Sequence, residues 1–286
     1  MNRTAECVTN ALCIVGESPL WREETQTLFM TDIHGKRIRS IDWRNGHVRD
    51  WVMPQQTGAL LLESGGGLMA CMEDGIYRVS ESGEASPLFA PLDLAGPRFN
   101  DVKVGPDGRI YGGTIHYQGH GAFYAIEPDG TMRTLLTGVG NANGLDWDAR
   151  HNLFYFIDTP TMCLFRFRFD PENGTIWDRS VVRRFETREG NPDGMTMDAE
   201  GMLWIALFGG GHALRIDPDT GKTLDEVVLP ASNVSCVAFA GEKLDEMVIT
   251  TAAHYTVLRS EPLAGAVFKV RLPVPGRPQH RFRASL

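Results

Sequence analysis

The sequence lacks both a run of residues that could cross a membrane and a recognisable export signal. No stretch approaches about 18 consecutive apolar residues, and residues 1–10 have no apolar segment of the signal-peptide kind. The five cysteines are odd in number and widely spaced, with no Cys-x-x-Cys pair, which argues against a disulfide framework or a zinc site. We therefore expect a cytoplasmic protein with no membrane partner.

Long basic segments are also missing. The chain carries 28 Lys and Arg residues against 36 Asp and Glu residues, a formal net charge of −8. Arginines cluster only in three short stretches, residues 166–168, 183–184 and 277–283. We interpret these as solvated strand faces and a mobile C-terminal tail. Since nucleic-acid binders usually present a basic patch, we expect no nucleic-acid partner.

Several common catalytic motifs are absent as well. The sequence contains no Gly-x-Ser-x-Gly, His-Glu-x-x-His or Gly-x-x-x-x-Gly-Lys-Ser/Thr motif. No segment shows a convincing 3.6-residue apolar stripe with caps, so we expect little helix. The 31 glycines are scattered along the chain, which is typical of many short strands joined by tight turns.

A repeat is the strongest feature that is present. Six short apolar strands recur at spacings of 40, 42, 43, 50 and 44 residues, and each is followed by a partner strand and a polar, Gly-containing turn. This period matches one four-stranded propeller blade. The six strands begin at Leu28, Leu68, Ile110, Leu153, Leu203 and Met247. We predict an all-β, six-bladed β-propeller with four-stranded blades around an axial channel; a β-sandwich or large barrel with accidental spacing is the alternative.

The two ends of such a ring have to meet. A lone strand is expected at about residues 6–15, ahead of the first blade, whereas the last blade is short of strands after Leu272. Pairing the two would remove an exposed sheet edge. We therefore predict that residues 1–286 form a single propeller domain, with the N-terminal strand closing the last blade.

The phase of the repeat also points to a site. About ten residues before each recurring strand lies an equivalent position at the start of an innermost strand, and the six positions should form a ring at one channel mouth. They are occupied by Glu17, Gly58, Asn100, Asn143, Asp193 and Ser235. Converging carboxylates and amide oxygens repel one another unless a cation lies between them, and all-oxygen ligation suits a hard divalent ion. The alternative is that these are ordinary turn residues.

Neighbouring polar residues suggest a small polar ligand. Arg98 lies two residues before Asn100, so strand alternation points both side chains the same way. Its rigid fork of donors suits carbonyl, hydroxyl or carboxylate oxygens, although a surface ion pair is equally compatible with the sequence. The loop over residues 115–121 holds His116, Gln118 and His120 and either forms a pocket wall or is simply exposed.

Five motifs together carry a family resemblance: GESPLW at residues 16–21, RFND at 98–101, NGLDW at 143–147, PDGMTMD at 192–198 and PLAGAVFKV near the C-terminus. In this order they resemble the senescence marker protein-30 (regucalcin), gluconolactonase and luciferin-regenerating enzyme family. The resemblance implies one divalent ion (Ca²⁺, Mg²⁺, Mn²⁺ or Zn²⁺) held by Glu17, Asn143 and Asp193. It further implies substrate contacts from Arg98 and Asn100, and Asp193 as general base.

The function implied is hydrolysis of a gluconolactone-like aldonolactone to the aldonic acid, with a sugar lactone as the small-molecule partner. Tyr117 and Gln118 stand where animal regucalcins carry an acidic pair, so we expect Gln118 and His116 to face the substrate. Two alternatives stay open: another metal-dependent ester or phosphotriester hydrolase, and a non-catalytic calcium- or protein-binding propeller. The sequence does not distinguish between lactones, between ions or between oligomeric states.

Overall fold

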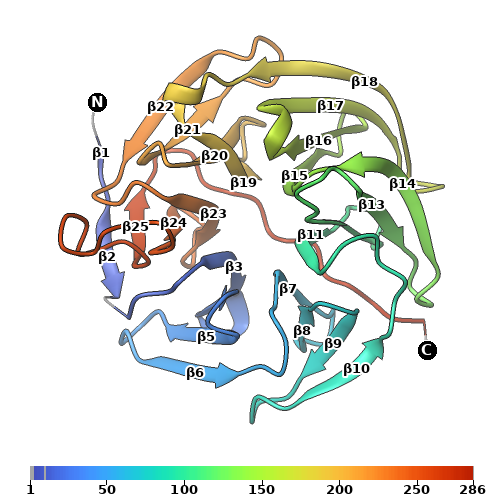
Figure 1. Cartoon of the computed structure of the whole chain (residues 1–286), viewed down its shortest axis with the longest axis horizontal. Coiled ribbons are helices and arrows are strands. Elements are labelled where there is room, and N and C mark those ends of the chain that lie inside the picture. Colours follow the sequence, from blue (N-terminus) through green and yellow to red (C-terminus); the bar gives the residue numbers. More distant parts are fainter. Residues whose placement is uncertain (1–2, 10, 286) are drawn as a thin grey trace.

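Six sheets stand side by side around a central axis in the computed structural model, which describes residues 3–9 and 11–285 (Figure 1). Each sheet runs from an innermost strand at the axis to an outermost strand at the rim. The predicted six-bladed β-propeller is therefore confirmed. The six strands that recur in the sequence are the second strand of each blade. Five of the ring residues lie on the innermost strands before them, and Gly58 directly precedes the sixth, β7.

The first three blades follow one another along the chain. Blade 1 consists of β3 (Gly16–Arg22), β4 (Thr27–Asp32), β5 (Arg37–Asp42) and β6 (Val48–Val52). Blade 2 consists of β7 (Ala59–Leu62), β8 (Leu68–Cys71), β9 (Ile76–Val79) and β10 (Ala85–Phe89). Blade 3 consists of β11 (Phe99–Val104), β12 (Ile110–Thr114), β13 (Gly121–Ile126) and β14 (Met132–Val139).

The remaining blades complete the ring. Blade 4 consists of β15 (Ala142–Asp148), β16 (Leu153–Asp158), β17 (Cys163–Asp170) and β18 (Thr175–Arg184). Blade 5 consists of β19 (Asn191–Met197), β20 (Leu203–Phe208), β21 (His212–Ile216) and β22 (Thr223–Val228); blade 6 begins with β23 (Val234–Ala240), β24 (Glu246–Thr251) and β25 (Val267–Arg271). Helix among the described residues is limited to three short 3₁₀ turns: η1 (Glu23–Thr25), η2 (Thr159–Thr161) and η3 (Thr187–Glu189).

The N-terminal segment closes the ring. Strand β2 (Glu6–Thr9) pairs antiparallel with β25 and supplies the outermost strand of blade 6. It is shorter than the strand expected over residues 6–15, because residues 11–13 are not in a strand and residue 10 lies outside the described residues. A second short strand, β1 (Arg3–Thr4), pairs in parallel with β22 of blade 5 and was not expected from the sequence.

The core lies between blades. Six apolar clusters are present, and each joins two neighbouring blades. The run Ala59–Leu62 shows why inner strands are continuously apolar: Leu60 and Leu62 pack toward blade 1, whereas Ala59 and Leu61 pack toward blade 3. Because successive side chains point to opposite faces and both faces are covered, every position must be apolar.

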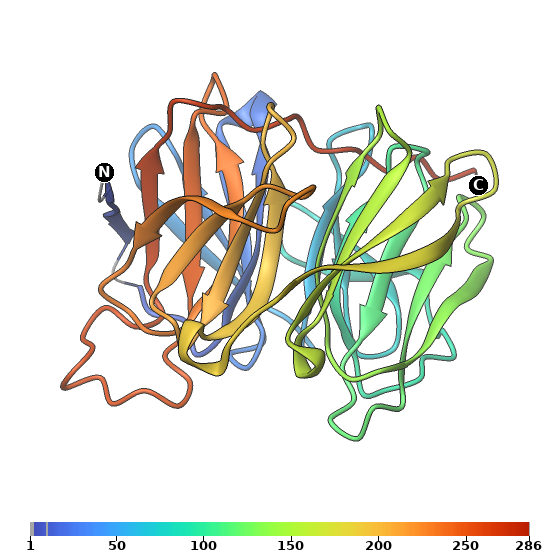
Figure 2. The ribbon, with the colours of Figure 1, turned by 90° about the horizontal axis from the view of Figure 1, so that it is seen from above.

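The C-terminal segment, residues 276–285, forms a strap across the channel mouth where the innermost strands end (Figure 2). The Gly276 N–H donates to the Leu244 carbonyl of blade 6, and Arg277 bonds Asp146 of blade 4. On the far side, Phe282 is fully buried between blades 2 and 3. The interpretation of this segment as a mobile tail is therefore wrong.

Candidate active site at the open channel mouth

The ring residues lie where the innermost strands begin, at the mouth opposite the strap. Five of these six strands break register with their neighbours at this point: β3 at Glu17/Leu20, β11 at Phe99/Val102, β15 at Asn143/Leu145, β19 at Pro192/Met195 and β23 at Val234/Cys236. Bulges of this kind re-aim side chains next to functional sites. Ser18, directly after Glu17, has a left-handed φ of 49°, a conformation uncommon outside glycine, and its N–H donates to Glu17 Oε2 at 2.9 Å.

Two of the six ring positions have structural roles. A Cβ atom at Gly58 would lie 2.2 Å from the Phe99 carbonyl oxygen, so only glycine fits there. The Ser235 hydroxyl is fully buried, donates to the Gly16 carbonyl at 2.5 Å and lies 2.9 Å from Thr250 Oγ1. This leaves two carboxylates and two amides on the ring.

A chain of hydrogen bonds joins the polar residues of blades 3, 4 and 5. Arg98 Nη1 donates to Asn100 Oδ1 at 2.6 Å, and Asn100 Nδ2 donates to Asn143 Oδ1 at 2.8 Å. Asn143 Nδ2 donates to Thr159 Oγ1 at 2.7 Å, and that hydroxyl donates to the Pro192 carbonyl, one residue before Asp193. The structure therefore brings the predicted residues Arg98, Asn100 and Asn143 into one rigid network.

The two ring carboxylates are buried without a cationic partner. Glu17 is 6% exposed and Asp193 is 8% exposed, and neither forms an ion pair with Lys, Arg or His within residues 3–9 and 11–285. Burial and the charge of Asp101 raise the pKa of Glu17 to about 8. Burial, followed by the charges of Glu17 and Asp101, raises the pKa of Asp193 well above its usual range, and the positive charge of Arg98 opposes both shifts.

Asp101 is a third acid of the site that the sequence reasoning missed. It is 7% exposed, and burial raises the pKa of its carboxyl to about 6, while Lys103 and Arg98 act in the opposite direction. Strand alternation from Asn100 would turn Asp101 away from the channel. The register break between Phe99 and Val102 cancels that alternation. Only the acidic residue following Asn100 in the RFND motif could have signalled it.

The third-blade loop is joined to Arg98 through its backbone, because the Ile115 N–H donates to the Arg98 carbonyl at 3.4 Å. The Tyr117 side chain of this loop is exposed. The Gln118 N–H donates to His116 Nδ1 at 3.3 Å, and the His116 and His120 rings lie 5.0 Å apart. The substrate contacts expected from Gln118 and His116 stay a prediction.

The donor set fits a hard divalent cation. Glu17 and Asp193 supply two buried negative charges, and each would be stabilised by a positive ion. The described residues hold no group of three or more His, Cys, Asp or Glu side chains arranged to bind a metal ion. An ion here therefore needs an amide as its third protein ligand. Asn143 Oδ1 accepts one hydrogen bond and keeps a second lone pair for this purpose.

No helix in the described part of the chain has the length and apolar character needed to cross a bilayer.

Fold and site together define a class: six-bladed propellers with an acid-and-amide cluster at one channel mouth. A sequence model described as the SMP-30/Gluconolactonase/LRE-like region matches residues 15–253. The chain belongs to this family. It is similar to a Bacillus subtilis protein named "Putative sugar lactone lactonase YvrE", with 36% identity over 96% of this chain and 97% of the relative.

Three further similarities are found. Human regucalcin is 34% identical over 93% of each chain. A solved luciferin-regenerating enzyme superposes with a TM-score of 0.89 at 26% identity, covering 99% of this chain and 100% of that one. A calcium-binding regucalcin of Agrobacterium tumefaciens superposes with a TM-score of 0.92 at 24% identity, over 99% of this chain and 100% of that one, and shows a shared fold.

Proposed function

We propose that this protein is a sugar lactonase that hydrolyses an aldonolactone to the aldonic acid, with one divalent cation held by Glu17, Asn143 and Asp193. The observation that carries the proposal is the pair of buried carboxylates, Glu17 and Asp193, that have no ion-pair partner among the described residues and lie next to the bonded Arg98–Asn100–Asn143 network. The name of the Bacillus subtilis relative, a putative sugar lactone lactonase similar over almost the whole chain, supports the same reaction class.

When bound, such a cation supplies Lewis acidity: it polarises a lactone carbonyl and lowers the pKa of a bound water. In this proposal Asp193 accepts the proton of the attacking water. Its place at the same mouth, without an ion pair among the described residues, supports this role. General base assistance of this kind is worth about 10²–10⁴-fold in rate.

Arg98 orients the substrate in this proposal. Its Nη1 is occupied by the Phe99 carbonyl and by Asn100, whereas Nη2 and Nε have no partner within the described residues. These donors are free for hydroxyl or carbonyl oxygens of a sugar lactone. Asn100 has both N–H groups occupied, by the Ala142 carbonyl and by Asn143, so it can accept from a substrate hydroxyl only through Oδ1. Its main role is to position Arg98 and Asn143.

The test is a pH-indicator assay of several aldonolactones with the purified protein, first with EDTA and then with Ca²⁺, Mg²⁺, Mn²⁺ or Zn²⁺ added. We expect acid release that EDTA abolishes and one of the ions restores. The Glu17→Ala/Asp193→Ala variant should lose both tight ion binding and activity, and Asn143→Ala should weaken both less because a neutral amide contributes less. Asp219→Ala, which removes an exposed acid, is the matched control.

Three results would contradict the proposal. Metal binding by the Glu17→Ala/Asp193→Ala variant at the parent level would show that the ligands are wrong. Hydrolysis of phosphotriesters or simple esters without turnover of any aldonolactone would assign the site to another hydrolase class. A metal-loaded protein that turns over none of these substrates would favour a non-catalytic binding propeller.

A further inference from the structure

A cavity occupies the channel between the acid cluster and the strap. Its volume is about 480 Å³, within the range of small-molecule sites. Much of the wall is hydrocarbon: Leu20, Leu60, Leu62, Val104 and Ala238 line it, and all five side chains are buried in the fold. We call this cavity the rear chamber. Apolar walls hold water poorly, so a chamber of this size is better filled by an apolar group.

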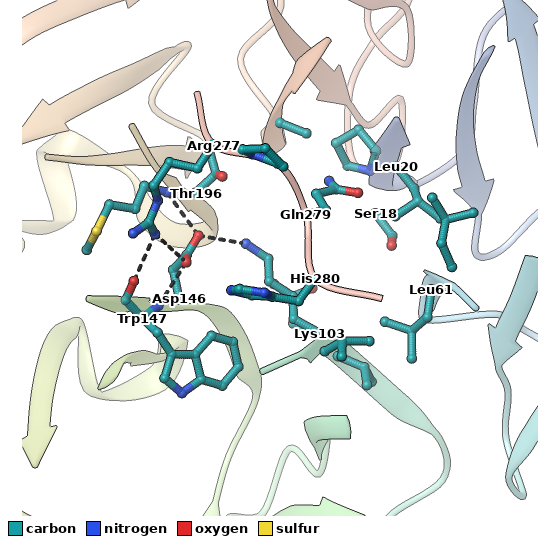
Figure 3. Close-up of a pocket in the computed structure, with 18 of the residues that line it drawn as sticks. Ser18, Leu20, Leu61, Lys103, Asp146, Trp147, Thr196, Arg277, Gln279 and His280 are labelled. Carbon is teal, nitrogen blue, oxygen red and sulfur yellow. Dashed lines mark hydrogen bonds and ion pairs between the residues drawn. The ribbon is translucent and has the colours of Figure 1, made fainter. Parts of the chain in front are cut away.

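One side of the rear chamber is charged (Figure 3). Asp146 lies between two cations, with Oδ2 3.2 Å from Lys103 Nζ and Oδ1 3.0 Å from Arg277 Nη2. Arg277 Nη2 also donates to the Trp147 carbonyl at 2.8 Å. The other guanidinium nitrogens of Arg277 have no partner in the described part of the chain, and its side chain is 35% exposed. His280 of the strap lies beside this cluster, whereas Gln279 lies toward Ser18 and Leu20.

The charges around the rear chamber favour an anion at the strap end. Lys103, Arg150 and Arg277 contribute three positive charges to its lining, and Asp101 and Asp146 contribute two negative ones. Asp146 is already paired with two of the cations. Asp101 lies under the acid cluster, at the end remote from the strap, and would repel an acid group placed there.

We infer that the rear chamber binds a small organic anion with a hydrocarbon body, such as a phenylalkyl or short alkyl carboxylate. The hydrocarbon part lies against the leucines and valines of blades 1 to 3. The carboxylate accepts hydrogen bonds from the unused N–H groups of Arg277, a geometry that a guanidinium fork matches. This site borders the proposed catalytic mouth at Asp101, is not lined by Glu17, Asn143 or Asp193, and does not depend on lactonase activity.

The probe is 4-phenylbutyrate, with 4-phenylbutanol as its neutral counterpart, titrated calorimetrically into the full chain. We expect one molecule bound per chain, with the alcohol at least about tenfold weaker, the equivalent of about 1.4 kcal/mol. Arg277→Gln should weaken the binding of 4-phenylbutyrate to the level of 4-phenylbutanol. Saturating gluconate, which occupies the catalytic mouth in the proposed function, should not displace the probe.

Two matched variants separate binding from loss of the strap. Arg281→Gln removes another strap arginine, paired with Glu24 outside the rear chamber, and should bind 4-phenylbutyrate as the parent does. Ala238→Phe fills the rear chamber while leaving the strap intact and should abolish binding, with an unchanged circular dichroism spectrum as the check on folding. Equal binding of acid and alcohol, parent-like binding by Arg277→Gln or Ala238→Phe, displacement by gluconate, or no binding at millimolar probe would each overturn the inference.

Discussion

Removing the Phe282 side chain tests whether the strap contributes to stability. The ring is fully buried, lies 5.9 Å from that of Phe89 in an edge-on arrangement, and belongs to the cluster between blades 2 and 3. The backbone of Phe282 is also fixed. Its N–H donates to the Leu62 carbonyl, and its carbonyl accepts a hydrogen bond from the Ser64 N–H at 2.7 Å. The strap is thus anchored here by one aromatic side chain and two backbone bonds.

The expected loss follows from the buried area. An aromatic side chain buries about 150–250 Å², which at about 25 cal/mol per Å² gives about 4–6 kcal/mol as an upper value. Measured Phe→Ala losses in cores run about 3–5 kcal/mol. Because the strap crosses the blades as a single chain, it can shift and partly refill the gap, so we expect the Phe282→Ala variant to lose about 3 kcal/mol. For a chain of this length that corresponds to about 5 °C in Tm.

The assay is thermal unfolding followed by circular dichroism, with Phe282→Ala compared with Arg283→Ala. Residue 283 is exposed and adjacent, so its variant controls for any change in this part of the strap. Phe282→Leu should fall between the parent and the alanine variant. A Tm for Phe282→Ala within about 1 °C of that of the control would refute the reasoning and show that the strap detaches before the blades unfold.

Three further outcomes are expected. Arg98→Ala should lower kcat/KM at parent-like metal content, and Arg98→Lys should not restore it because the fork of donors is lost; loss of metal would instead show that Arg98 supports the ligands. A hydrogen bond from Arg39 lowers the pKa of Asp50, so the pair stabilises the fold above the unfolded pKa of about 3.9 and this stability is lost as pH falls through the lower folded value. The Tm difference between parent and Asp50→Asn should therefore be constant near neutrality and shrink below about pH 4. Finally, we expect anionic aldonolactones to compete with neutral ones for hydrolysis. The His116→Ala/His120→Ala variant should show weaker competition by the anionic lactones, and unchanged competition would show that the loop is not part of the pocket.

The fold could be predicted because every blade repeats the same apolar pattern and the same turn chemistry. The strap could not, because a single chain crossing the channel has no period of its own. Its arginines read as solvent-exposed, yet Arg277 finds its partner at Asp146, 131 positions away, and Phe282 packs against Phe89. Such pairings depend on closure of the whole ring.

The part of the candidate site that could be predicted is the part that the repeat places. Equal phase on the innermost strands selected Glu17, Asn143 and Asp193, and their roles in binding an ion stay a prediction. Asp101 escaped because period-two alternation fails at a bulge, and no sequence pattern marked where β11 breaks register. The same limit applies to Gly58, whose place on the ring follows from a close backbone approach rather than from chemistry.

The pairing of β2 with β25 has a consequence for synthesis on the ribosome. Glu6 leaves the ribosome about 260 residues ahead of the strand that it completes, and at about 5–20 residues per second that interval is roughly 13–50 s. During this time β2 has no sheet to join, and blade 6 cannot be completed. Blades 1 to 5 can form in order as they emerge, whereas the step that closes the ring must wait until nearly the whole chain has been made.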